Sequence, residues 1–96
     1  MSINDVFQAL ADPTRREILR LLRQRDMSAG ELAERFPLAK STLSGHFRSL
    51  RQAGLILPER RGTTIRYSLN VSAAEEAVGL IMDALRVGKA RKGAPS

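Results

Sequence analysis

The chain contains no cysteine, and this absence excludes several functions at once. Without thiols it can form no disulfide, no thiolate metal site and no cysteine nucleophile. No apolar run approaches the ~20 residues that a membrane-spanning helix needs. The first residues also lack the basic and apolar segments of a secretory signal. We therefore expect a cytoplasmic protein without membrane insertion.

Aromatic residues and catalytic side chains are also scarce. Three phenylalanines, one tyrosine and no tryptophan are too few for the stacking platform of a single-strand nucleic-acid binder. The single histidine, His46, has no second histidine or helically spaced carboxylate with which to share a metal. The sequence offers no nucleophile–base pair and no glycine-rich phosphate loop. We therefore expect no enzyme activity, no metal and no cofactor.

Acidic residues are nearly missing from the central part of the chain. The protein has 96 residues and a formal net charge of +6. Met1–Ala39 holds six basic and six acidic residues, whereas Lys40–Arg66 holds six basic residues against Glu59 alone. A basic segment that excludes acids is the electrostatic footprint of a polyanion, here interpreted as double-stranded DNA. A solvated surface with an excess of arginine is the alternative.

Capping residues predict where several helices begin. Asp12 is a favourable N-cap and Pro13 suits the first helical position, so a helix begins there. The spacing of Ser28 and Glu31 is that of a capping box before a short helix. Ser72 is expected to cap the last helix.

Apolar spacing and chain breakers predict the remaining elements. Residues 2–10 are predicted to form a short first helix and residues 41–53 a fourth helix, which Gly54 ends. The period then changes to short β-branched runs around residues 62–64, which predicts a hairpin. Pro58 indicates that its first strand is an edge strand.

The predicted fold is therefore mainly α-helical with a small β-hairpin, in the order four helices, two strands and a fifth helix. A short helix, a tight turn and a second helix form a helix-turn-helix, whose second helix lies in the major groove of DNA. The basic hairpin directly after it is a wing. Residues 1–88 are expected to form one domain, and residues 89–96 a flexible basic tail.

The fourth helix and the wing supply the candidate DNA contacts. With Leu43 in the core, Phe47 and Leu50 join it, and a polar face without acids turns outward. Hydroxyl groups can bond base edges or phosphates, and arginine can bind guanine through two hydrogen bonds. The expected contacts of the fourth helix are Lys40, Ser41, Thr42, Ser44, Gly45, His46 and Arg48. The expected contacts of the wing are Arg60, Arg61, Thr63, Thr64 and Arg66.

Some of these residues have a purely structural alternative. Gly45 either lets the helix approach the groove closely or is simply tolerated, at a cost of up to ~1 kcal/mol. His46 either contacts DNA or packs on the flank of the helix. The arginines of the hairpin either reach DNA or lie in solvent.

Three motifs, in this order, resemble those of the arsenical-resistance repressor family, also called ArsR. They are D-P-T-R-R-x-I-L from Asp12 to Leu19, S-x-H-F-x-x-L-x-x-A-G-L from Ser44 to Leu55, and R-x-G-x-x-x-x-Y-x-L from Arg60 to Leu69. The resemblance covers about residues 3–70. It implies a dimeric winged helix-turn-helix repressor in which residues 41–53 form the recognition helix and the first and last helices form the dimer interface.

Apolar residues on the terminal helices agree with the implied homodimer. They provide more hydrophobic surface than a domain of this size needs, although packing onto the domain's own core is the alternative. A two-fold dimer would present two recognition helices about one DNA turn apart, ~34–36 Å, and so read a palindrome. The expected interface residues are Val6, Phe7, Leu10, Ala74, Val78, Ile81 and Leu85.

The chain departs from the metal-sensing members of the family at their ligand positions. Ser28 and Gly30 occupy the places of the cysteine pair, and the last helix offers only Glu75, Glu76 and Asp83. Neither a soft-metal site nor a zinc site can be built from these ligands. The resemblance is therefore to the branch without metal ligands, some of whose members are autorepressors controlled by a partner protein. A regulatory partner protein, a small-molecule ligand and a winged helix that binds protein all stay open.

Overall fold

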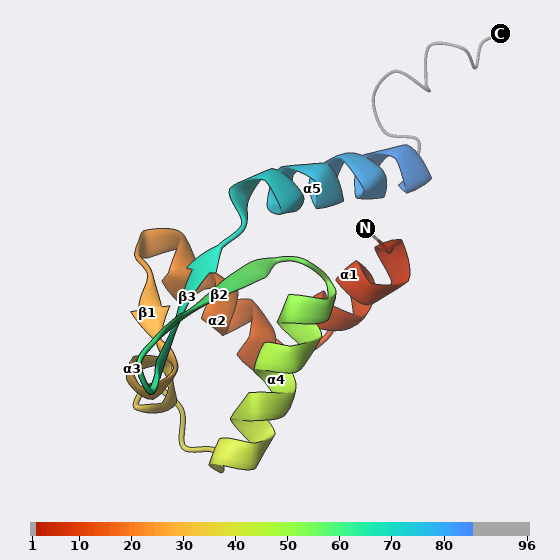
Figure 1. The fold of residues 1–96 in the computed structure, drawn as a ribbon. Coiled ribbons are helices and arrows are strands. Elements are labelled where there is room, and N and C mark those ends of the chain that lie inside the picture. The colour runs from red at the N-terminus through yellow and green to blue at the C-terminus, as the bar shows by residue number, and fades with distance from the viewer. Residues whose placement is uncertain (1, 86–96) are drawn as a thin grey trace, which may run out of the picture.

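The computed structural model describes residues 2–85, which form the expected mainly α-helical fold with a small antiparallel sheet (Figure 1). The basic tail predicted for residues 89–96 lies outside the described residues. None of the helices within residues 2–85 is both long and apolar enough to cross a membrane. In chain order the elements are α1 (Ile3–Leu10), α2 (Pro13–Gln24), β1 (Met27–Ser28), α3 (Ala29–Ala33), α4 (Lys40–Gln52), β2 (Ile56–Arg61), β3 (Thr64–Leu69) and α5 (Val71–Leu85).

Most helix boundaries follow the local capping signals. Asp12 Oδ1 accepts hydrogen bonds from the backbone N–H of Thr14 at 2.7 Å and of Arg15 at 3.2 Å, which begins α2. Ser28 and Glu31 form the predicted capping box at the start of α3, with bonds of 3.0 Å and 2.8 Å between side chain and backbone. The bond from the Ser28 N–H, with nearby arginine charge, outweighs partial desolvation and lowers the pKa of Glu31.

The last helix begins earlier than the sequence predicted. Ser72 was expected to cap it, but α5 begins at Val71 because Asn70 is the cap. Asn70 Oδ1 accepts from the backbone N–H of Ala73 at 3.2 Å, while its Nδ2 donates to the carbonyl of Gly54 at 3.0 Å. Asn70 therefore joins the start of α5 to the segment that ends α4, where Gly54 has a φ of +77°.

The hairpin belongs to a sheet of order β1-β3-β2. Arg61 pairs with Thr64 next to the turn, where Gly62 has a φ of +62°. Pro58 lies in β2, which is an edge strand as predicted. The two-residue strand β1 was not predicted, because a segment this short leaves no alternating pattern. Its Met27 pairs with Tyr67 of β3.

The core lies where α1, α2 and α4 meet the base of the sheet. Phe47 of α4 packs on Tyr67 of β3 with ring centroids 4.8 Å apart. Val6 is fully buried in this core, at 0% exposure, so its side chain presents no surface of the protomer to the predicted dimer interface. Val6 and Ala9 lie on the inward face of α1, whereas Phe7 faces outward and is 47% exposed. The core includes Val6, Ala9, Ile18, Leu21, Leu22, Met27, Leu32, Leu43, Phe47, Leu50, Ile56 and Tyr67.

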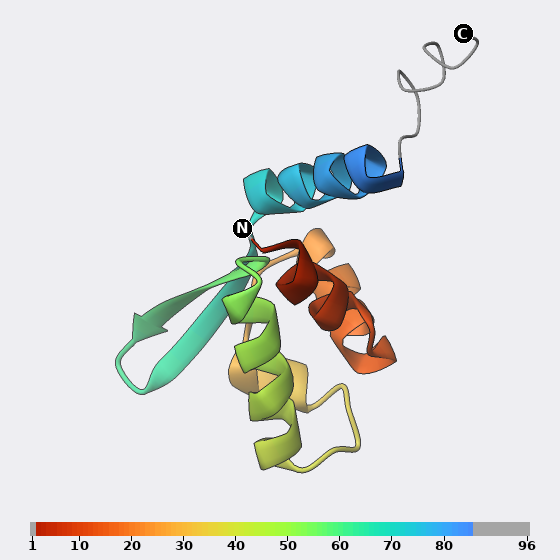
Figure 2. The same cartoon turned by 90° about the vertical axis from the view of Figure 1, so that its right-hand side faces the viewer.

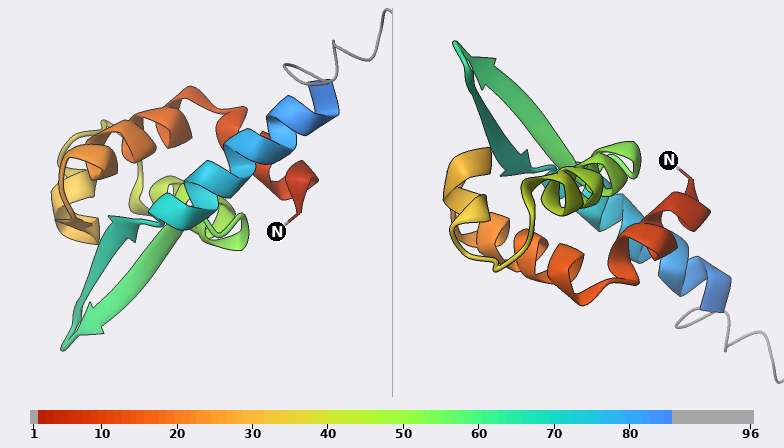
Figure 3. Two further views of the ribbon diagram at one scale, coloured as in Figure 1. Left: turned by 90° about the horizontal axis from the view of Figure 1, so that it is seen from above. Right: turned by 90° about the horizontal axis from the view of Figure 1, so that it is seen from below.

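The arrangement separates two surfaces of the domain. In Figures 1 and 2, α5 lies along one side, and the N-terminal end of α4 lies on the opposite side. The hairpin extends from the body as an arm, as the views from above and below also show (Figure 3). The candidate DNA-reading elements and the apolar last helix are therefore set apart.

Candidate nucleic-acid interface

Helix α4 presents a polar face that is free of acidic side chains. Leu43, Phe47 and Leu50 are buried, so the opposite face turns outward as the periodicity predicted. Ala39 makes no side-chain hydrogen bond at the N-terminus, which leaves the first N–H groups of α4 without a side-chain cap. Such N–H groups and the positive end of the helix dipole suit a phosphate. The exposed predicted contacts on this helix are Lys40, Ser41, Thr42, Ser44, Gly45 and Arg48.

Gly45 lies in the middle of this exposed face. A Cβ atom built at this position would meet nothing within 4 Å. The glycine is therefore not required by packing inside the protein. Two explanations of Gly45 therefore remain. Either it lets α4 approach a partner closely, or a glycine is simply tolerated at this position.

The wing carries the remaining predicted contacts. Arg60, Arg61, Thr63 and Thr64 are all exposed. Arg61 lies 3.4 Å from the Glu59 carboxylate, but both side chains are more than 60% exposed, so this pair contributes little to stability. The arginine is thus available to exchange Glu59 for a phosphate.

Arg66 lies midway along β3 and has contacts within the protein. Its Nη2 donates to the Asp26 carbonyl at 3.4 Å, and its Nη1 lies 4.0 Å from the Glu31 carboxylate. The side chain is only 41% exposed. Arg66 therefore differs from the arginines near the tip of the wing, and its role as a DNA contact stays a prediction.

Arg51 is a candidate contact that the sequence did not reveal. It lies between Arg48 and the wing, where a hollow of about 500 Å³ separates the last turns of α4 from β2. An adjoining hollow of about 220 Å³ is lined by Arg51, Pro58, Arg60 and Ile65. No local pattern in the sequence indicates this contact, because only the position of the wing brings Arg51 beside Arg60.

His46 lies on the flank of α4 rather than on its outer face. Its side chain is 13% exposed, with Nδ1 at 3.1 Å from Nη1 of Arg15 and Nε2 at 3.9 Å from Oδ1 of Asp12. Of the two alternatives for His46, this geometry favours the packed flank residue. Contact with DNA is not supported, because the ring is covered by α2.

Asp12 is an anion in this cluster. Partial desolvation acts to raise the pKa of Asp12, but the N–H donors of Arg15 and Thr14, together with nearby His46 and Arg15, outweigh it and lower the pKa below its ordinary value of 3.8. At neutral pH the carboxylate therefore both caps α2 and faces the imidazole of His46.

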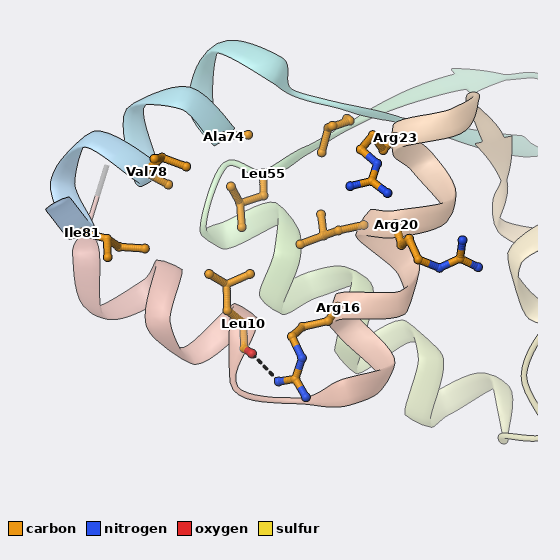
Figure 4. Close-up of a pocket in the computed structure, with 11 residues that line it drawn as sticks. Leu10, Arg16, Arg20, Arg23, Leu55, Ala74, Val78 and Ile81 are labelled. Carbon is orange, nitrogen blue, oxygen red and sulfur yellow. Dashed lines mark hydrogen bonds between the residues drawn. The ribbon is translucent and has the colours of Figure 1, made fainter.

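An apolar surface lies on the other side of the domain, along α5. Phe7 of α1 and three residues of α5, Val78, Met82 and Leu85, are 47%, 56%, 45% and 68% exposed. Beside them, a groove of about 320 Å³ runs between α2 and α5 (Figure 4). Its lining is mostly apolar: Leu10, Leu19, Leu55, Leu69, Ala74, Ala77, Val78 and Ile81, with Arg16, Arg20 and Arg23 from α2.

The described part of the chain brings together no three side chains of metal-binding type that could hold an ion. Ser28 caps α3, and Gly30 is exposed. Ser28 and Glu31 already form hydrogen bonds with one another through side chain and backbone. The local chemistry of α3 is therefore that of a helix cap.

These features define a class, the winged helix-turn-helix transcriptional regulators, in which the second helix and the wing bind DNA. Residues 12–57 match the family described as "Bacterial regulatory protein, arsR family". The transcriptional repressor SdpR of Bacillus subtilis is 41% identical over 86 residues, which span 90% of this chain and 96% of that protein. This protein belongs to the arsR family of bacterial regulatory proteins, which confirms the resemblance of its motifs.

Other relatives extend the comparison. The transcriptional activator HlyU of Vibrio cholerae is 32% identical over 76 residues, which span 79% of this chain and 70% of that protein. The structure of an ArsR-like transcriptional regulator from Rhodococcus sp. RHA1 superposes with a TM-score of 0.79 at 30% identity, covering 97% of this chain and 87% of that one. All three relatives are named as transcriptional regulators, in agreement with the prediction that this chain is not an enzyme.

Proposed function

We propose that this protein is a homodimeric repressor that binds a palindromic operator, acts in the cytoplasm and responds to no metal. The observation that carries the proposal is the outward face of α4, which joins basic and hydroxyl side chains without an acid and lies beside a basic wing. Phosphate contacts by the wing and α4 supply most of the affinity. Repression follows the similarity to SdpR, whereas HlyU is named as an activator.

The apolar surface of α1 and α5 supports the homodimer. Phe7, Val78 and Leu85 are each about half or more exposed in the protomer, and burial of such side chains is the main driving force of association. The proposed dimer requires a two-fold contact through these helices that leaves both α4 helices free to meet the same face of the DNA. The pair then matches two half-sites about one DNA turn apart.

The first experiment measures binding to the DNA directly upstream of the protein's own gene. Fluorescence anisotropy at two salt concentrations compares this duplex with a scrambled duplex of equal length. We expect the scrambled duplex to bind about a thousandfold more weakly, and both affinities to fall steeply with salt. Equal affinity for both duplexes would contradict an autorepressor and leave either an operator elsewhere or a protein partner.

Zinc is expected to leave the DNA complex intact. A structural or sensory zinc site needs about four ligands of nitrogen, sulfur or carboxylate type, and no such group is present within residues 2–85. Titration of Zn²⁺ into the complex, with EDTA as the reversal step, measures this directly. Release of the operator at a stoichiometric amount of zinc, reversed by EDTA, would overturn the proposal of a metal-independent repressor.

Control by a partner protein or a small ligand is the second part of the proposal. The groove between α2 and α5 favours the ligand variant, because its walls are mostly apolar and it shares Leu10, Ala74, Val78 and Ile81 with the predicted dimer interface. A ligand or partner that binds there changes the packing of α5. The alternative is a winged helix that binds a protein instead of DNA. A preference for the native duplex in the anisotropy experiment would exclude this alternative.

A further inference from the structure

Arg15 connects three helices through a single guanidinium group. It extends from the first turn of α2, where its backbone N–H also bonds the cap residue Asp12. Its Nε donates to the carbonyl of Ala9 at 3.0 Å, and its Nη2 donates to the carbonyl of Gln8 at 2.7 Å. Its Nη1 lies 3.1 Å from Nδ1 of His46, in the middle of α4. One side chain thus joins the end of α1, the start of α2 and the recognition helix.

The contact between Arg15 and His46 has a defined direction. A guanidinium only donates hydrogen bonds, so Nδ1 of His46 must be the acceptor. The imidazole proton is therefore on Nε2, which faces the Asp12 carboxylate at 3.9 Å. One ring nitrogen of His46 thus accepts from Arg15 of α2, and the other lies within 4 Å of Asp12, the N-cap of α2, so both neighbours orient the ring.

The position of His46 in α4 gives this contact its significance. On either side of it along the chain, Gly45 and Arg48 belong to the outward face that is proposed to read DNA. The carbonyls that Arg15 holds belong to α1, which carries Phe7 and Leu10 of the proposed dimer surface. The cluster therefore sets the angle between the helix that would touch the partner subunit and the helix that would touch the bases.

We infer that Arg15 and His46 are positioning residues that fix the recognition helix against α1, and that neither of them contacts DNA. The inference rests on the proposed function, because it assigns a role in DNA reading. It goes further in naming two residues that act through the orientation of α4. Their loss reduces discrimination between duplexes while the number of phosphate contacts stays the same.

Arg16 offers a matched control for Arg15. It is the next residue on α2, and its Nη1 also donates to a carbonyl at the end of α1, that of Leu10, at 2.7 Å. Within the described residues it has no hydrogen bond to α4. Arg16→Lys and Arg15→Lys therefore make the same chemical change, and only the second disrupts the guanidinium that bonds α1 and His46 together.

The first test uses the protein without DNA. Long-range ¹H–¹⁵N spectra of the imidazole, in mildly alkaline buffer, are expected to place the proton of His46 on Nε2. In backbone spectra, Arg15→Lys is expected to shift amide signals along α4, whereas Arg16→Lys leaves them in place. A proton on Nδ1, or shifts confined to α2 in both variants, would overturn the link between the helices.

The second test measures DNA binding by two substitutions of His46. His46→Asn keeps an acceptor near the place of Nδ1, whereas His46→Leu removes it, and circular dichroism checks that both variants are folded. We expect His46→Leu to bind the operator about tenfold more weakly, with unchanged affinity for scrambled DNA and an unchanged salt slope, and His46→Asn to stay close to the wild type.

Other outcomes distinguish the failures. An equal loss on both duplexes with a salt slope smaller by about one would make His46 a phosphate contact, and wild-type affinity of His46→Leu would remove its positioning role. If the wild type itself fails to prefer the operator, the proposed function fails, and the spectra of the free protein still decide whether the two residues link the helices.

Discussion

Replacing Val78 and Leu85 together by aspartate is expected to give a folded monomer that binds its operator at least a hundredfold more weakly than the wild type. Both side chains are more than half exposed in the protomer, so the new charges do not enter its core. In the proposed dimer they would lie buried and unpaired, which strongly disfavours association. Loss of the second recognition helix then removes the gain from bivalent binding, which is about 10²–10⁴-fold.

The measurement combines light scattering after size exclusion with anisotropy on the native duplex. Ser72→Asp is the control for a new aspartate on α5, because it adds one such charge at an exposed position outside the apolar stripe. This control is expected to remain dimeric. A double variant that stays dimeric would place the interface elsewhere, and a monomer with full affinity would show that one recognition helix is sufficient.

Arg48→Ala and Arg61→Ala are expected to weaken DNA binding in two different ways. Arg48 lies on the outward face of α4, where arginine can bind guanine through two hydrogen bonds worth about 1–3 kcal/mol of discrimination. Its loss should reduce the preference for the operator over scrambled DNA by about tenfold or more. Arg61 lies near the tip of the wing, so its loss should weaken both duplexes alike and lower the salt slope by about one.

Parallel titrations of both variants on both duplexes, at several salt concentrations, separate these effects. Arg51 extends the comparison, because it lies between Arg48 and Arg60 in the hollow beside the wing. As a phosphate contact it should behave like Arg61. The same response of the Arg48 and Arg61 variants on both duplexes would contradict the division of roles between α4 and the wing.

Much of this architecture was predictable because its signals are local. The caps at Asp12 and Ser28 act over three residues, and the buried face of α4 follows from the helical period of Leu43, Phe47 and Leu50. The outward polar face consists of the residues of α4 that this buried stripe leaves on the other side of the helix. Hence the order of the five helices and the hairpin, although not strand β1, and most of the candidate DNA surface could be predicted from the sequence.

The features that were missed depend on residues far apart in the chain. Arg15 and His46 are 31 positions apart, and nothing in either neighbourhood indicates that they meet. Asn70 outcompetes Ser72 as the cap of α5 because it also bonds the Gly54 carbonyl, 16 positions away. Val6 has the same apolar character as Phe7, and only the packing of α1 decides which of them is buried. Long-range packing, rather than residue type, determined each of these outcomes.

The edge strand β2 has a consequence for the free protein before it meets any partner. An unpaired edge displays a row of N–H and C=O groups that another chain can join, which is a common route to aggregation. In β2, Pro58 has no N–H group and so removes one of these donors. The exposed Glu59, Arg60 and Arg61 place charges along the rest of the strand. The residues proposed to hold phosphates thus also keep the hairpin from pairing with its copies, so substitutions in the wing should be assayed for solubility as well as for affinity.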